Sequence, residues 1–291
     1  MKKLLRIYQS SRTHWVGDGF PVRSVFDYNG LGKELSPFLL LDYVAPYEFR
    51  PSNRRRGVEA HPHKGFETVT IAFQGEINHR DSSGGGGKIG PGDVQWMTAG
   101  SGIIHEEFQS EEFTRKGGTF QMVQLWVNLR GRDKTAKPRY QNLLKAQIPV
   151  VTLPTEAGTM RVIAGEYGGH KGPAKTFTPI NLWEVNLRRG KSAELPLPDW
   201  HTSAFFVLSG EIAVNGEATA AECDLAIFAR TGSGISVVSR KNAKFLVMDG
   251  EPIEEPVVGR GPFVMNTYAE IQHAFEDYQL GRMGEIPEAV P

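Results

Sequence analysis

Short apolar runs broken by turn-forming residues dominate the chain. Typical examples are TVTIAFQGEI, SAFFVLSGEIAVNG and AKFLVMDGEP, in which apolar and β-branched residues are followed by Gly, Asn or Asp. Runs of this kind are typical of strands, and the 33 glycines and 18 prolines supply residues for many turns. The pattern therefore predicts an all-β protein built from many short strands.

One helix is predicted near the C-terminus. Thr267 can cap its first turn together with Glu270, because three residues separate them as in a capping box. Apolar side chains then recur at helical spacing and should pack on a sheet: Ile271, Ala274, Phe275 and Tyr278. A weaker helical pattern, RYQNLLKAQIP, ends in proline near the middle of the chain, and we interpret it as the connection between two domains.

Two parts of the chain resemble each other. The segment at 67–77 (ETVTIAFQGEI) is similar to that at 202–212 (TSAFFVLSGEI). The segment at 92–103 (GDVQWMTAGSGI) is likewise similar to that at 223–235 (CDLAIFARTGSGI). The offset is about 132 to 135 residues in both cases, which indicates two copies of one β-rich unit.

Composition narrows the class of function. Lys plus Arg and Asp plus Glu both total 33, so no net basic charge attracts the chain to nucleic acid. No apolar stretch reaches the roughly 18 residues of a transmembrane helix, and MKKLLRIYQS lacks the apolar run of a signal peptide. We therefore expect a cytoplasmic protein. Its one cysteine, Cys223, excludes an internal disulfide and a CxxC motif, so a metal would need histidine and carboxylate ligands.

Two segments of the first copy carry such residues, HPHKGFE and HEE. Alternate side chains of a strand share a face, so His61 points with His63, and His105 points with Glu107. The intervening GEINHRDSSGGGGKIGPGDV contains a glycine-rich tip and a Pro-Gly-Asp turn, which would return the second strand antiparallel to the first. Three imidazoles and one carboxylate can then converge on a divalent metal and leave positions for water or substrate.

Two carboxylates compete for the fourth position. Glu67 has the parity of the first histidine pair unless Pro62 or Gly65 distorts the strand, and Glu107 shares the face of His105. In the second copy the offset places other residues at the five positions: Pro196, Pro198, Thr202, Val237 and Ser239. We therefore expect one metal per chain, in the first copy. The remaining histidines without partners at ligand spacing are interpreted as structural: His14, His79, His170 and His201.

These motifs resemble those of the pirin family within the cupin superfamily. HxHxxxE followed by a glycine, PGD and GxxH is close to the two-part cupin motif. The segments HPHKGFETV, GDVQWMTAGSGIIHEE, QLWVNLR, PFLLLDYV and GPFVMNT resemble pirin segments over nearly the whole chain. The resemblance implies a bicupin, with two tandem antiparallel β-barrels of the jelly-roll type. We expect a metal-binding barrel over residues 1–140 and a metal-free barrel with the terminal helix over residues 141–291.

The resemblance also implies four metal ligands: His61, His63, His105 and Glu107. The metal it implies is Fe(II), although the same donor types accept Mn, Co, Ni, Cu or Zn. Glu67 is then assigned to orienting a ligand imidazole. Glu106, which has the opposite parity to its neighbours, should point away from the site.

Three classes of function use such a site. The resemblance implies a quercetin 2,3-dioxygenase-like enzyme, in which a small aromatic substrate and O2 react at the metal and Glu107 accepts the hydroxyl proton of the substrate. The alternatives are a pirin-like, iron-dependent redox-sensing regulator that acts through protein partners, and a cupin isomerase that uses the metal as a Lewis acid. No nucleic acid and no membrane is expected as a partner.

Overall fold

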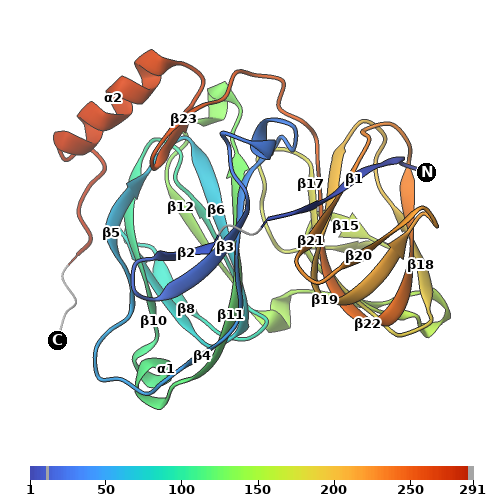
Figure 1. The fold of residues 1–291 in the computed structure, drawn as a ribbon. Helices are drawn as coiled ribbons and strands as arrows, with labels where there is room; N and C mark the ends of the chain where they lie inside the picture. Colours follow the sequence, from blue (N-terminus) through green and yellow to red (C-terminus); the bar gives the residue numbers. More distant parts are fainter. Residues whose placement is uncertain (11–12, 288–291) are drawn as a thin grey trace. The chain divides into compact units, whose positions relative to one another are not determined.

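The computed structural model describes residues 1–10 and 13–287, and its chain is mostly β (Figure 1). It forms two compact units. The unit that we call the first barrel comprises Arg12–Glu34, Phe38–Lys145 and Ile253–Pro291, and the second barrel comprises Met1–Ser11, Leu35–Pro37 and Ala146–Pro252. The predicted all-β bicupin with one C-terminal helix is confirmed.

Two antiparallel sheets form the first barrel. The larger sheet has the strand order β12 (Arg139–Leu143), β9 (Val94–Thr98), β6 (Phe66–Gln74), β11 (Gly118–Asn128), β4 (Phe38–Phe49), β3 (Phe20–Phe26) and β2 (Thr13–Val16). The smaller sheet has the order β5 (Gly57–His63), β10 (Ile103–Gln109), β7 (Ile77–Asp81) and β8 (Gly86–Ile89). A short helix, α1 (Glu111–Lys116), follows β10 and is capped by the Ser110 side chain.

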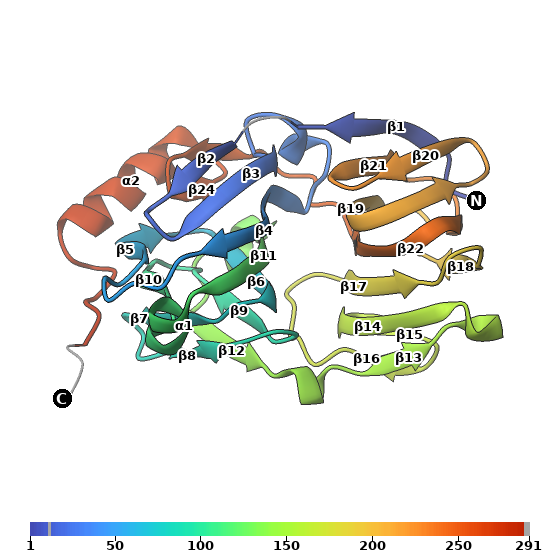
Figure 2. The ribbon, with the colours of Figure 1, turned by 60° about the horizontal axis from the view of Figure 1, so that its bottom comes forward.

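One large antiparallel sheet curls into the second barrel (Figure 2). Its strand order is β1 (Leu4–Gln9), β21 (Asp224–Phe228), β19 (Thr202–Val214), β22 (Gly234–Gly250), β17 (Ile180–Leu187), β14 (Gly158–Ala164) and β13 (Val150–Thr152). Two further strands join it, β18 (Ser192–Pro196) on β22 and β20 (Ala218–Ala221) on β19. A continuous apolar cluster, which includes Trp183, Phe205 and Phe245, fills its interior.

Short elements complete the two units. Two-stranded ladders form between β15 (Glu166–Tyr167) and β16 (His170–Lys171), and between β23 (Val258–Arg260) and β24 (Phe263–Met265). Among the residues that the structure describes, the strands are also connected by 3-10 turns: η1 (Leu31–Lys33), η2 (Gly131–Asp133), η3 (Lys145–Gln147) and η4 (Pro154–Glu156). Within the described ranges, the helices lack the length and apolar character needed to cross a bilayer.

The predicted terminal helix is confirmed as α2 (Tyr268–Gln279). Thr267 and Glu270 form the capping box, in which each side chain accepts a backbone N–H of the other residue. Ile271 and Ala274 are buried in an apolar cluster with Phe263 of β24, and Phe275 packs against it, as the stripe predicted. Tyr278, the fourth residue of the predicted stripe, is exposed instead. Packing of this stripe supplies the stability that twelve isolated residues would lack.

A single division at residue 140 would place the N-terminal strand in the first barrel and the C-terminal helix in the second. In the structure each belongs to the other unit. Strand β1 pairs with β21 of the second barrel, and α2 packs with the first barrel, next to Ile104 of β10. The placement of the helix in the first barrel could not be predicted from the sequence. An amphipathic stripe indicates that one face of a helix is buried, but it does not indicate which unit buries it.

The helical interpretation of RYQNLLKAQIP is wrong. Residues Arg139–Leu143 form β12, which pairs in register with β9 from Thr98 to Val94. Ladder hydrogen bonds to a neighbouring strand outweigh the weak helix propensity of these residues. The correction matters for the site, because it places Tyr140 on the barrel wall.

Candidate metal centre

Three histidines converge on neighbouring strands of the first barrel. In the β5–β10 ladder, His61 lies opposite His105 and His63 lies opposite Ile103. One ligand nitrogen from each of the three rings lies within 4.8 Å of the others. The ring centroids are 4.2 Å apart for His61 and His105, and 4.9 Å apart for each of the other two pairs. Strand alternation therefore brings together the histidines that the two motifs supply.

The connection between these strands is longer than a hairpin. The strands β6 to β9 intervene between β5 and β10, and the glycine-rich segment forms the turn between β7 and β8. The two strands nevertheless pair antiparallel, because the chain closes the smaller sheet around β10.

Two of the rings are held by backbone carbonyl oxygens. His61 Nδ1 is 2.8 Å from the carbonyl oxygen of Glu59, and His63 Nδ1 is 3.2 Å from that of Pro262. A carbonyl oxygen only accepts, so each ring carries its proton on Nδ1 and donates it. The Nε2 lone pair of each ring is left to bind a cation.

The burial of the cluster favours neutral rings. Burial, reinforced by the neighbouring His61, lowers the pKa of His63 to about 3, and the same two causes hold the pKa of His105 well below its usual value. Neutral imidazoles are the form that binds metal ions. His105 Nε2 is also buried and has no hydrogen-bond partner among the described residues. These rings therefore fit a divalent metal, which would complete the coordination of that orphaned atom.

Glu107 lies on β10 beside this cluster and is buried. Its Oε1 accepts hydrogen bonds from Gln95 Nε2 and from Thr70 Oγ1, the latter at 3.4 Å, and its Oε2 accepts from Gln124 Nε2 at 2.9 Å. One of its oxygens lies within 4.8 Å of ligand atoms of His105 and His79. Within the described chain, the group of His61, His63 and His105 that meets the same limit does not include Glu107.

Glu67 lies elsewhere because the strand is interrupted at Gly65. That glycine has a φ of +89°, in the left-handed region, and it ends β5 so that Glu67 belongs to β6 of the other sheet. Glu67 Oε1 accepts a 2.7 Å hydrogen bond from Thr98 Oγ1 and lies 3.9 Å from the Arg139 guanidinium. In the part of the chain that the structure describes, its carboxyl group contacts these residues instead of an imidazole. Burial raises the pKa of Glu67 to about 7.

Glu106 points away from the histidines, as predicted. Its Oε1 accepts hydrogen bonds from Arg55 at 2.7 Å and from Arg80 at 2.9 Å. These two guanidinium groups lower its pKa against the opposing effect of burial, which would raise it.

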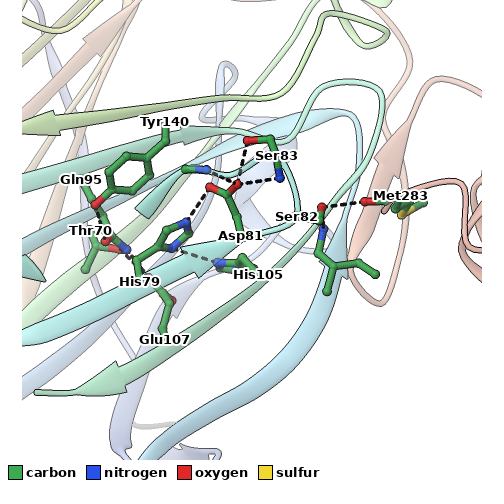
Figure 3. A network of polar contacts seen from close by, with 12 residues as sticks. Thr70, His79, Asp81, Ser82, Ser83, Gln95, His105, Glu107, Tyr140 and Met283 are labelled. Atoms are coloured by element: carbon green, nitrogen blue, oxygen red, sulfur yellow. Dashed lines mark hydrogen bonds and ion pairs between the residues drawn. The ribbon is translucent and has the colours of Figure 1, made fainter. Parts of the chain in front are cut away.

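The prediction that His79 has no partner at ligand spacing is wrong, because one of its ring nitrogens lies within 4.8 Å of ligand atoms of His105 and Glu107. On β7, opposite Glu107, it lies between two groups of the site (Figure 3). Its Nδ1 is 3.4 Å from His105 Nδ1, and its Nε2 is 3.0 Å from Asp81 Oδ2. The Tyr140 ring stacks on it, with the centroids 4.7 Å apart and an interplanar angle of 17°. The signal in the sequence is the alternation of His79 and Asp81 in INHRD, which places both on one face.

An aromatic wall covers the other side of the cluster. The rings of Phe66 and Trp126 stack with centroids 4.2 Å apart, and each lies 5.1 Å from the His63 ring. This wall makes the surroundings of His63 apolar, which accounts for the direction of its pKa shift.

Comparison with known proteins agrees with the motifs. The pirin family matches residues 19–127, and the pirin C-terminal cupin domain matches residues 182–284. The chain is 55% identical over 282 residues to a Pseudomonas aeruginosa protein named "Putative quercetin 2,3-dioxygenase PA2418", covering 97% of this chain and 98% of that one. It is 39% identical over 258 residues to human pirin, covering 87% and 84% of the two chains. The crystal structure of a quercetin 2,3-dioxygenase from Acinetobacter baumannii superposes with a TM-score of 0.96 at 51% identity, covering 99% of this chain and 100% of that one. The chain therefore belongs to the pirin family.

Proposed function

We propose that this protein is a metal-dependent dioxygenase that opens the central ring of a flavonol such as quercetin with O2. The observation that carries the proposal is the convergence of three histidine rings next to a buried glutamate side chain, Glu107. The names of the two bacterial relatives support the substrate class.

The histidines His61, His63 and His105 would hold the metal, with Glu107 as the fourth ligand. Fe(II) is the metal we favour, and Mn, Co, Ni, Cu and Zn are the alternatives that these donors accept. A redox-capable divalent metal held there would supply Lewis-acid and redox chemistry for the reaction of a flavonol with O2.

Charge favours an anionic substrate at this site. Three neutral imidazoles and one carboxylate leave a divalent ion with about one net positive charge. A flavonol that has lost its 3-hydroxyl proton carries the opposite charge, so the metal-loaded site would stabilise the deprotonated form.

Glu107 is placed to accept that proton. Its carboxylate is oriented by donors from Thr70, Gln95 and Gln124, so the side chain is held in one geometry before substrate arrives. A positioned carboxylate that removes a hydroxyl proton acts as a general base, and the substrate becomes electron-rich and reactive toward O2.

The aromatic wall suits a flat substrate. Phe66 and Trp126 present stacked rings next to His63 and keep water from that side of the cluster. His61 is only partly buried, so the cluster is reached from solvent at that ring. A planar ligand that approaches past His61 can pack on apolar surface while its oxygens face the histidines.

The test separates an enzyme from a regulator. The protein is purified under anoxic conditions, its metal content is measured, and O2 uptake is followed with and without quercetin. We expect uptake that depends on both the metal and quercetin. Metal-replete protein that takes up no O2 above the metal-only blank would overturn the proposal and favour the iron-dependent, redox-sensing regulator or the isomerase.

A further inference from the structure

The three histidines differ in what fixes their protons. His61 and His63 donate from Nδ1 to backbone carbonyl oxygens, which can only accept. His105 instead faces His79, Nδ1 to Nδ1, at 3.4 Å. A neutral imidazole nitrogen either donates or accepts, so this contact alone leaves the proton of His105 undetermined.

Asp81 removes the ambiguity (Figure 3). Its Oδ1 accepts from Ser83 N at 2.8 Å, Ser83 Oγ at 2.7 Å and Gly85 N at 3.0 Å. Burial works to raise the pKa of Asp81, but the hydrogen bonds from His79, Ser83 and Gly85 outweigh it and keep the pKa below its usual value. The group is therefore a carboxylate, and its Oδ2 can only accept from His79 Nε2, 3.0 Å away.

The proton positions then follow in order. Because Oδ2 accepts, His79 donates from Nε2, and the neutral form of that ring offers its Nδ1 lone pair to His105. His105 must then donate from Nδ1, which leaves the lone pair of its buried Nε2 free to bind a metal. Tyr140 stacks flat on His79 and resists rotation of that ring.

We propose that Asp81 and His79 form a positioning pair that fixes the tautomer of His105 with its proton on Nδ1, and so prepares Nε2 as a metal ligand. This inference rests on the proposed metal centre, and it holds whichever reaction the centre performs. Neither residue touches the metal itself in this arrangement. Both act through the His105 ring.

The first test needs no substitution. The full-length, metal-free protein is labelled with 15N-histidine, and long-range 1H–15N correlation spectra report which nitrogen of each ring is protonated. We expect His105 to carry its proton on Nδ1 and His79 to carry it on Nε2. A spectrum with the His105 proton on Nε2 would overturn the proposal, whatever the protein does with O2.

The second test reverses the pair with Asp81→Asn. The three donors at Oδ1 require an acceptor there, so the new amide must turn its NH2 toward His79 Nε2. His79 then carries its proton on Nδ1 and donates to His105, whose own proton moves to Nε2, the atom that must bind metal. We expect the inverted tautomer in the spectrum and roughly 10- to 100-fold weaker Zn(II) binding, the usual cost of losing an outer partner of a ligand histidine.

Ser83→Ala is the matched control, because it removes one donor to Asp81 and leaves the contact with His79 unchanged. We expect its Zn(II) affinity to stay within about threefold of the wild-type value, since no outer partner of a ligand histidine is lost. If Asp81→Asn fails to fold, His79→Phe serves instead: it keeps an aromatic ring under Tyr140 and removes the acceptor for His105. Weaker Zn(II) binding with mixed His105 tautomers is expected for that variant. Wild-type affinity and a single Nδ1–H form in either folded variant would overturn the proposal, and because Zn(II) binding uses neither O2 nor flavonol, the result is independent of the dioxygenase assay.

Discussion

The two barrels place opposite chemistry at corresponding ladder positions. In the first barrel His61 lies opposite His105, and His63 lies opposite Ile103. In the second barrel the matching ladder between β18 and β22 pairs Ala193 with Val237 and Leu195 with Ile235, all buried and apolar. At these ladder positions the first barrel therefore has a cluster of histidines, whereas the second barrel has a continuous apolar core.

The ladder also corrects the alignment of the two copies. A constant offset predicted Pro196 and Pro198 as the counterparts of the HxH pair, whereas the strand register gives Ala193 and Leu195. The constant offset fails because the loop between β18 and β19 is three residues longer than the loop between the equivalent strands β5 and β6. The counterparts of His61 and His63 in the second barrel are therefore the buried apolar residues Ala193 and Leu195, and not the two prolines.

The partners of the histidines differ in the same way. Residues opposite Glu107 and His105 on β7 are His79 and Asp81. Residues opposite Ser239 and Val237 on β19 are Ile212 and Val214, which belong to the apolar core. The barrel that lacks ligands also lacks the residues that would orient them. This difference supports the proposal that the Asp81–His79 pair belongs to the metal centre and not to the scaffold.

The largest expected effect comes from giving the first barrel a residue of the second. His63→Leu copies Leu195, and it should reduce the metal content from one per chain to near zero, because a ligand is lost. The metal-free protein should lose about 1 to 3 kcal/mol of unfolding free energy, because the Pro262 carbonyl oxygen loses the Nδ1–H donor of His63. Metal analysis and denaturant unfolding measure the two quantities.

Two metals per wild-type chain would break the comparison between the barrels. So would a His63→Leu protein that still binds one metal, because the first barrel would then hold metal without its HxH pair.

Removal of core volume from the second barrel should have the complementary effect. Leu195→Ala deletes a fully buried side chain and should cost about 2 to 5 kcal/mol of unfolding free energy. Metal content should stay at the wild-type value. Leu195→Met, which keeps the volume, is the control and should cost less than about 1.5 kcal/mol. A loss of metal in folded Leu195→Ala protein would show that the second barrel is more than a scaffold.

The parts of this comparison that the sequence predicted are those that depend on strand alternation. HPH and HEE each place two side chains on one face, and β5 and β10 are neighbours, so the convergence of the histidines could be predicted. The contacts that fix the rings could not, because the Pro262 carbonyl and the Asp81–His79 pair come from other strands and turns. Glu67 does not share the face of His61 and His63, because the strand ends at Gly65, which has a positive φ. The sequence showed that Gly65 could interrupt the strand but not that it does.

The third prediction concerns the carboxylate beside the cluster. Glu107→Gln removes the proton acceptor and should lower quercetin-dependent O2 uptake by about 100-fold, or about 2.7 kcal/mol in activation free energy. Its counterpart in the second barrel, Ser239, has no such function, so Ser239→Ala should leave uptake unchanged. Uptake is measured at equal metal content. Wild-type rates in metal-loaded Glu107→Gln would exclude Glu107 as the base.

The smallest effect is expected at Glu67, and it distinguishes the two candidate carboxylates. Glu67→Gln keeps an oxygen that can accept from Thr98, so metal content should stay at one per chain and O2 uptake should change little. Equal loss of metal in the Glu67 and Glu107 variants would instead make Glu67 a ligand.

Stability should reveal the buried state of Glu67 through its pH dependence. Because burial raises its pKa to about 7 in the folded protein, the folded state binds a proton more tightly than the unfolded state does. The stabilisation is therefore complete below the unfolded pKa and is lost as the pH rises through about 7. Between about pH 5 and about pH 7 the wild-type protein should lose roughly 2 kcal/mol of unfolding free energy relative to Glu67→Gln, which has no proton to release there. Parallel pH profiles for the two proteins in urea unfolding would mean that Glu67 is ionised in the fold, with Arg139 as its partner.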